Sequence, residues 1–78
     1  MLNYAVKLDS VKDLMELKKM ADKFGIKGTI NQNGFHGDMR SVLKNILYLP
    51  LEDATVEIND YSESQVGYIS EAITRLSA

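Results

Sequence analysis

The residues in this chain that could do chemistry are few, and they gather around a single histidine. His36 is followed by Asp38 and then by Ser41, so the three side-chain types of a nucleophilic triad are nominally present. No glycine-flanked strand-to-helix turn surrounds Ser41, and such a turn is what exposes a nucleophilic serine. We therefore expect His36 to be a solvated residue just past a turn, and we expect no catalytic residues and no enzyme activity.

The sequence gives equally little support for a metal site or a cofactor site. One histidine and no cysteine cannot supply a typical transition-metal site. The glycines are scattered and do not form a phosphate-binding loop. Asp9 and Asp13 lie close together, but capping of a helix start accounts for them. The sequence predicts neither a metal nor a cofactor.

Length and composition bound the architecture. Seventy-eight residues make one domain, 1–78, with 45% hydrophobic and 26% charged residues, which are ordinary values for a globular protein. The start lacks the pattern of a signal peptide, and no apolar run is long enough to span a bilayer. We expect a cytoplasmic monomer that does not bind membranes.

Charge and aromatic content bear on the partners. Residues 1–51 carry eight basic and five acidic side chains, whereas residues 52–78 carry one basic and six acidic side chains. A dipolar surface of this kind can orient a charged partner, although chance asymmetry also accounts for it. The strands are poor in aromatic residues and the chain is acidic, so we expect no nucleic-acid binding.

The hydrophobic spacing predicts seven elements in the order β-α-β-β-α-β-α. Alternation predicts strands at 2–8, 26–32, 35–39 and 54–59, with an Asn33-Gly34 type I′ turn between the second and third. Helices are expected after caps at Ser10, Ser41 and Ser62, where Ser10 with Asp13 and Ser62 with Gln65 have capping-box spacing. The first helix should stop at Gly25, the second before Pro50 and the third near Leu76. This order favours helices packed on one face of a mixed or antiparallel sheet.

The first two helices carry more apolar residues than one core-facing stripe needs. The core stripe of the first helix is expected to contain Val11, Leu14, Leu17, Ala21 and Phe24, which places Met15 and Met20 off the main face. In the second helix Val42, Leu43, Ile46 and Leu47 cannot all point inward. Either they pack at the edge of the core or they form an exposed docking patch.

The stretch from Lys23-Phe24 through Ile58 resembles HPr, the phosphocarrier family of the bacterial sugar phosphotransferase system. The Asn33-Gly34 hairpin, Met39-Arg40-Ser41-Val42-Leu43, Leu49 and Ala54-Thr55-Val56-Glu57-Ile58 follow the family's pattern without an evident gap. The resemblance implies an HPr-like α+β fold: a four-stranded antiparallel sheet with three helices on one face.

The chain departs from that family where the family does its chemistry. HPr proteins carry a histidine, an arginine and a proline at the start of the first helix, and this chain has Leu8-Asp9-Ser10-Val11-Lys12-Asp13-Leu14 there instead. Asp9 and Asp13 would repel a phosphate, and His36 is not the family's histidine. We therefore expect no phosphohistidine transfer.

Two other family features are kept. Ser41 matches the regulatory serine that a dedicated kinase modifies in many Gram-positive HPr proteins, although serine is also simply a good helix cap. Arg40, Val42, Leu43 and Ile46 match the family's partner-docking patch. The resemblance implies a bacterial regulatory module whose partner is a phosphotransferase-system enzyme, a serine kinase or a transcription regulator. The alternatives are a phosphocarrier that uses an atypical residue and a small-molecule sensor.

Overall fold

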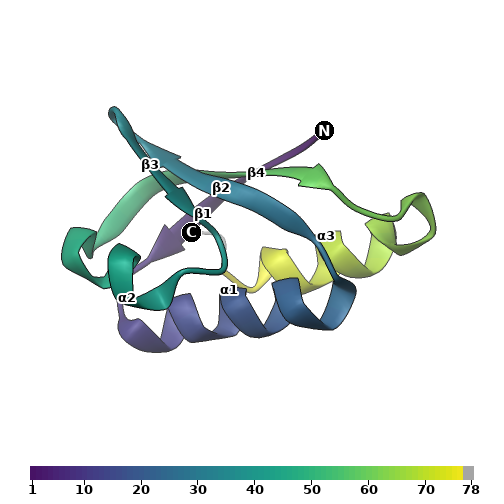
Figure 1. Cartoon of the computed structure of the whole chain (residues 1–78), viewed down its shortest axis with the longest axis horizontal. Coiled ribbons are helices and arrows are strands. Elements are labelled where there is room, and N and C mark those ends of the chain that lie inside the picture. The colour runs from purple at the N-terminus through teal and green to yellow at the C-terminus, as the bar shows by residue number, and fades with distance from the viewer. Residues whose placement is uncertain (77–78) are drawn as a thin grey trace.

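Four antiparallel strands form one sheet in the order β1-β4-β2-β3 in the computed structural model, which describes residues 1–76. Along the chain the elements are β1 (Leu2–Leu8), α1 (Val11–Phe24), β2 (Lys27–Gln32), β3 (Phe35–Asp38), α2 (Val42–Asn45), η1 (Ile46–Tyr48), β4 (Leu51–Asp60), η2 (Glu63–Gln65) and α3 (Val66–Thr74), where η marks a turn of 3-10 helix. The helices lie on one side of the sheet (Figure 1). The expected α+β fold and its β-α-β-β-α-β-α order are confirmed.

Strand β4 is one of the two inner strands of the sheet and pairs with β1 on one side and with β2 on the other. Val56 of β4 lies opposite both Tyr4 and Ile30 in the two registers. Val56 and Ile30 are completely buried, since their side chains point to the face that the helices cover. The buried apolar residues of all elements form one core: Val6, Leu8, Leu14, Leu17, Met20, Ala21, Ile26, Ile30, Met39, Leu51, Ala54, Val56, Ile58, Ile69, Ile73 and Leu76.

The turn between β2 and β3 has the conformation that its sequence predicts. Asn33 and Gly34 both have positive φ angles, 44° and 87°. A type I′ turn needs positive φ at both central residues, which asparagine and glycine tolerate best. The turn sets the register in which Gln32 pairs with Phe35.

Helix α1 begins and ends as expected. The side chain of Ser10 accepts a hydrogen bond from the Asp13 amide, while the Asp13 carboxylate accepts from the Ser10 amide, which completes a capping box. At the other end Gly25 adopts a left-handed φ of 63° and its amide bonds the Ala21 carbonyl.

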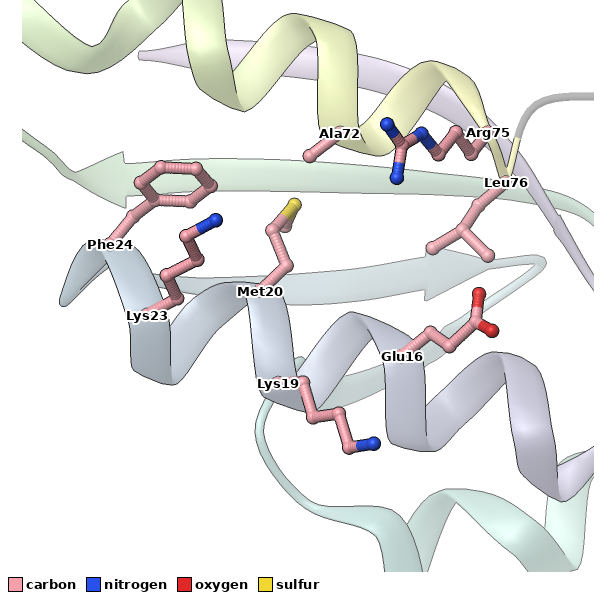
Figure 2. Close-up of a pocket in the computed structure, with 8 residues that line it drawn as sticks. All are labelled: Glu16, Lys19, Met20, Lys23, Phe24, Ala72, Arg75 and Leu76. Carbon is pink, nitrogen blue, oxygen red and sulfur yellow. The ribbon is translucent and has the colours of Figure 1, made fainter.

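Two residues of α1 lie differently from the sequence prediction. Met20 is buried, because it packs in the angle between α1 and the C-terminal end of α3, near Ala72 and Leu76 (Figure 2). Val11 is 39% exposed, because the first residue of α1 lies at the end of the helix and outside the core cluster. The stripe that α1 buries is therefore shifted toward α3.

The second half of the chain differs more in its element boundaries. The predicted second helix is one short α-helical turn, α2, followed by the 3-10 turn η1, and β4 begins at Leu51 rather than Ala54. The expected capping box of Ser62 with Gln65 is absent, because the chain first forms η2 and the Ser62 hydroxyl bonds Ser64. Strand β3 ends one residue early, at Asp38.

Two contacts fasten α3 to the edge strand β1. The hydroxyls of Tyr4 and Ser70 lie 2.6 Å apart in a hydrogen bond. The backbone amide of Lys7 donates to the Leu76 carbonyl at 2.7 Å, next to the point where the β1–β4 register shifts. The end of α3 is therefore held against one outer edge of the sheet.

Candidate functional site

An apolar patch lies on the surface of α2 and η1. Leu43 is 83% exposed and Leu47 81% exposed, and Ile46 between them is 37% exposed. The spacing of Leu43, Ile46 and Leu47 is that of one helical face, so the three side chains form a continuous strip. We call these three residues the apolar patch. An isolated exposed leucine needs no explanation, but a group of neighbouring large apolar side chains is a candidate interaction surface.

The four patch residues expected from the sequence do not all lie on the exposed surface. Leu43 and Ile46 belong to the apolar patch, whereas Val42 is half-buried and packs against the core. Arg40 lies at the start of the segment with its guanidinium on α1. Leu47 also belongs to the apolar patch: the hydrophobic spacing of the second helix included it among the candidates for an exposed patch, but the set implied by the resemblance to HPr did not.

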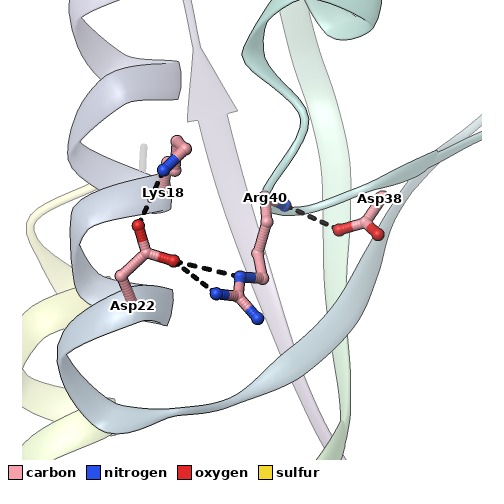
Figure 3. Close-up of polar contacts among 4 residues, drawn as sticks. All are labelled: Lys18, Asp22, Asp38 and Arg40. Atoms are coloured by element: carbon pink, nitrogen blue, oxygen red, sulfur yellow. Dashed lines mark hydrogen bonds and ion pairs between the residues drawn. The ribbon is translucent and has the colours of Figure 1, made fainter.

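Arg40 ties the start of α2 to α1 through Asp22 (Figure 3). Its Nε and Nη2 donate to Oδ1 of Asp22 at 3.0 and 2.7 Å, and Nζ of Lys18 pairs with Oδ2 of the same carboxylate at 2.7 Å. The hydrogen bond from Lys18, and then that from Arg40, holds the pKa of Asp22 below its ordinary value. Arg40 therefore positions the segment and is not a free charge on its surface.

The face of α1 that carries Lys18 and Asp22 also carries an exposed apolar residue. Met15 is 48% exposed and lies one turn before Lys18, on the stripe that also contains Asp22. Helix α2 lies beside the N-terminal half of α1 (Figure 1). Met15 is thus on the side of α1 whose Asp22 binds Arg40 at the start of the α2–η1 segment.

Asn45 anchors the back of α2 to strand β3. Its side chain is buried, and its Nδ2 donates to the Asp38 carbonyl at 2.8 Å. Gly37 makes room for this contact, because a Cβ atom at residue 37 would collide with Oδ1 of Asn45 and would lie 2.7 Å from the Phe35 ring. The patch residues are therefore exposed on a segment whose opposite side is fixed.

Ser41 stands at the first position of α2 but its hydroxyl does not cap the helix. It is half-buried and lines a cavity of about 450 Å³ together with His36, Asp38 and Lys44. With only four residues, α2 is too short for a helix dipole to stabilise a phosphate on Ser41. Lys44 is the cation of that cavity, and Asp38 is its carboxylate.

The structure brings His36, Asp38 and Ser41 to one cavity without joining them into a triad. Nδ1 of His36 is hydrogen-bonded to Oδ1 of Asn31 at 2.7 Å, across the β2–β3 pair. Oδ1 of Asp38 accepts from the Arg40 amide at 2.8 Å. Among residues 1–76 no hydrogen bond links Ser41 to His36 or His36 to Asp38. His36 is exposed just past the turn, as expected.

The Asp13 carboxylate accepts hydrogen bonds from the backbone amides at the junction of β1 and α1. Oδ2 of Asp13 accepts hydrogen bonds from the amides of Asp9 and Ser10 at 2.9 and 3.3 Å. These are backbone donors at a helix start, which is where proteins commonly hold a phosphate. A negative side chain already lies there, so the junction disfavours a second anion.

In residues 1–76 no three His, Asp or Glu side chains converge in a group that could hold a metal ion. No helix over the same residues has the length and apolar character needed to cross a bilayer. No protein-family model, curated protein or solved structure was found to match this chain.

Proposed function

We propose that this chain is an HPr-like regulatory module that binds a protein partner through the apolar patch of α2 and η1 and does not transfer phosphate through a histidine. The observation that carries the proposal is the exposure of Leu43 and Leu47, 83% and 81%, on a segment fixed from behind by Asn45. Burying large apolar side chains at the centre of an interface supplies much of its binding energy.

The absence of phosphohistidine transfer is supported by the start of α1. The resemblance to HPr would place the active histidine there, and this chain has a capping box in which Asp13 accepts the local amides. His36 is bonded to Asn31 on the sheet instead. We propose a cytoplasmic bacterial protein that acts as a monomer.

Binding should be measured against three purified partners: the first enzyme of the phosphotransferase system, its serine kinase and a transcription regulator that binds HPr proteins. The Leu43→Ser/Leu47→Ser double variant should weaken binding to the recognised partner by about tenfold or more, as expected for central interface residues. The matched control is Tyr68→Ser, because Tyr68 is 66% exposed on α3, away from the patch.

Several outcomes would contradict the proposal. They are equal binding by the double variant and the wild type, equal loss in Tyr68→Ser, and binding to none of the three partners. If the free wild-type chain sediments as a stable dimer and the double variant sediments as a monomer, the patch binds a second copy of this chain instead.

Ser41 is the proposed control point of this interface. Its hydroxyl makes no capping bond and lines an open cavity beside Lys44. Phosphorylation adds close to two negative charges one turn or less from Leu43, which would change partner affinity. Mass spectrometry after kinase treatment should locate the phosphate on Ser41, and Ser41→Ala should abolish it. Equal partner binding by treated and untreated wild type would refute the switch.

Incubation with the first enzyme and phosphoenolpyruvate separates this proposal from a genuine phosphocarrier. We expect no acid-labile phosphate on the chain. An acid-labile phosphate that is lost in His36→Ala would establish phosphotransfer and overturn the regulatory assignment.

A further inference from the structure

A groove between α1 and α3 lies apart from the α2 surface. The groove has a volume of about 380 Å³. A second hollow of about 180 Å³ adjoins it, and both are lined by Phe24 and Ala72. Small-molecule sites in proteins begin at about 300 Å³. The groove is therefore large enough for a small ligand but not for a folded partner.

The floor of the groove is apolar. Met20 and Leu76 line it and are only 8% and 7% exposed, with Ala72 beside them and the Phe24 ring at one end (Figure 2). These side chains come from both helices, so an apolar ligand body would contact α1 and α3 at once. Their positions favour an aliphatic or aromatic group over a polar one.

Three cations line the groove: Lys19 and Lys23 on α1, and Arg75 directly after α3. The Lys23 ammonium and the Arg75 guanidinium both extend over the groove (Figure 2). Within residues 1–76 neither forms an ion pair, and Nζ of Lys23 lies 5.5 Å from the centre of the Phe24 ring. Arg75 is also the one basic residue after Leu51, in a stretch with six acidic residues. The groove and the second hollow are lined by three cations, Lys19, Lys23 and Arg75, and by two carboxylates, Glu16 and Glu71, so the lining has a net charge of +1 although the chain as a whole has a net charge of −2.

The other end of the groove carries the opposite charge. The Glu16 carboxylate projects toward Leu76, at the end away from Phe24 (Figure 2). A ligand with one anionic group can place it at Lys23 and Arg75 and leave its apolar body on Met20 and Leu76. A ligand with a second anion at its far end would meet Glu16.

We propose that the α1–α3 groove binds a small amphipathic monoanion, of the class of a medium-chain aliphatic carboxylate. The carboxylate lies between Lys23 and Arg75, and the chain lies on Met20, Ala72 and Leu76. Charge-assisted hydrogen bonds from an arginine and a lysine suit a carboxylate, and the apolar floor supplies the remaining affinity.

The test is an NMR titration of the amide-labelled full chain with octanoate below its micelle concentration. Octanoate should shift the amides of residues around Met20 and Ala72 in a saturable way. Suberate, which has the same chain length and a second carboxylate, should bind more weakly because of Glu16. Octylammonium should bind more weakly than octanoate, because Lys23 and Arg75 repel its ammonium and the attraction of Glu16 at the far end offsets this only in part.

Single substitutions test which residues of the groove contact octanoate. Lys23→Gln and Arg75→Gln should each weaken octanoate binding by about fivefold, the range expected for a partly exposed charged hydrogen bond. Lys12→Gln, which removes a charge from the far end of α1, is the matched control and should change the affinity by less than about twofold under the same screening. Ala72→Leu should fill the groove and abolish octanoate binding. Glu16→Gln should reduce the difference in affinity between octanoate and suberate.

Four results would overturn the proposal. They are no saturable shift with octanoate, shifts centred on α2, equal binding of octylammonium, and equal affinities of Lys23→Gln, Arg75→Gln and Lys12→Gln. The spectrum of each unliganded variant shows whether it is folded, and a variant that is not folded is replaced by Lys23→Met or Arg75→Met. Because the groove does not include the apolar patch, failure here leaves the proposed partner binding untouched.

Discussion

Single residues in this chain link elements that lie far apart in the sequence, and Asp22 is the clearest example. Its two carboxylate oxygens take separate partners, Lys18 on its own helix and Arg40 at the start of α2. All three side chains are half-exposed, so each pair contributes little free energy on its own. What the pairs provide is position, because they bring the start of α2 to the side of α1 that carries Met15.

The titration of Asp22 reports on this link. Its pKa is lowered, first by the hydrogen bond from Lys18 and then by that from Arg40, so Lys18→Gln and Arg40→Gln should each raise it, Lys18→Gln more. A depressed folded-state pKa stabilises the fold above the unfolded-state value and loses that effect as pH falls through the folded-state value. The stability difference between Arg40→Gln and the wild type should therefore vanish in acid.

Carboxyl-carbon NMR shifts of Asp22 measured from neutral pH into acid give its pKa directly. Lys19→Gln is the control, because Lys19 neighbours Lys18 in sequence but makes no ion pair among the described residues. An Asp22 titration curve that is the same in all four proteins would rule out the link.

At the scale of elements, local sequence determined some boundaries and tertiary contacts determined others. Asn33-Gly34, the Ser10–Asp13 capping box and Gly25 act within a few residues, so the sequence alone predicted the turn and both ends of α1. The length of α2 could not be predicted in this way. The segment changes to a 3-10 turn directly after Asn45, whose side chain is held by the Asp38 carbonyl seven residues earlier.

The capping box gives a prediction for α1. Asp13→Ala removes the acceptor of two amides and should lower the free energy of unfolding by about 1 kcal/mol, within the range for lost caps. Ser10→Ala should cost less, because the Asp13 amide reaches its hydroxyl only at 3.4 Å. Urea unfolding followed by circular dichroism measures both.

Glu16→Ala is the control for that series, since the Glu16 side chain is exposed and makes no hydrogen bond among the described residues. It should change stability by less than about 0.5 kcal/mol. Equal losses in Glu16→Ala and Asp13→Ala would mean that the capping box does not stabilise α1.

The whole molecule depends on contacts between distant parts of the chain, and these explain what the sequence could not predict. Alternation in β1 and β4 predicted the buried face of each strand, and the order of elements fitted one covered sheet. The burial of Met20 depends on α3, which begins more than forty residues later. The site was found only in part for the same reason: helical spacing identified Leu43 and Ile46, but nothing local paired Arg40 with Asp22.

The close packing of β2 on β4 is testable across the whole fold. A Cβ atom at Gly28 would collide with the Glu57 carbonyl and lie 3.0 Å from Cα of Ile58, both backbone atoms of the inner strand β4. Gly28→Ala should therefore cost about 1–3 kcal/mol, the range for overpacking. For a domain of this size each 1 kcal/mol lowers Tm by about 4–8 °C.

Gly67→Ala is the opposite case and the matched control. Gly67 lies in the first turn of α3 with no atom within 4 Å of the added Cβ. Alanine there should stabilise the protein by up to about 1 kcal/mol, because it restricts the unfolded chain and favours the helix. Calorimetric scans of the two variants should shift in opposite directions, and a fall in Tm for both would contradict the packing argument.

The bond from the Lys7 amide to the Leu76 carbonyl has a consequence for aggregation. Strands β1 and β3 are the two edges of the sheet, and an edge strand offers its backbone groups to any extended chain that approaches. β3 is only four residues long and so offers a short template. β1 has seven residues, but the segment directly after α3 occupies its Lys7 amide through the Leu76 carbonyl. This bond removes one of the donors that the longer edge would otherwise offer to the strand-by-strand growth that builds cross-β fibrils.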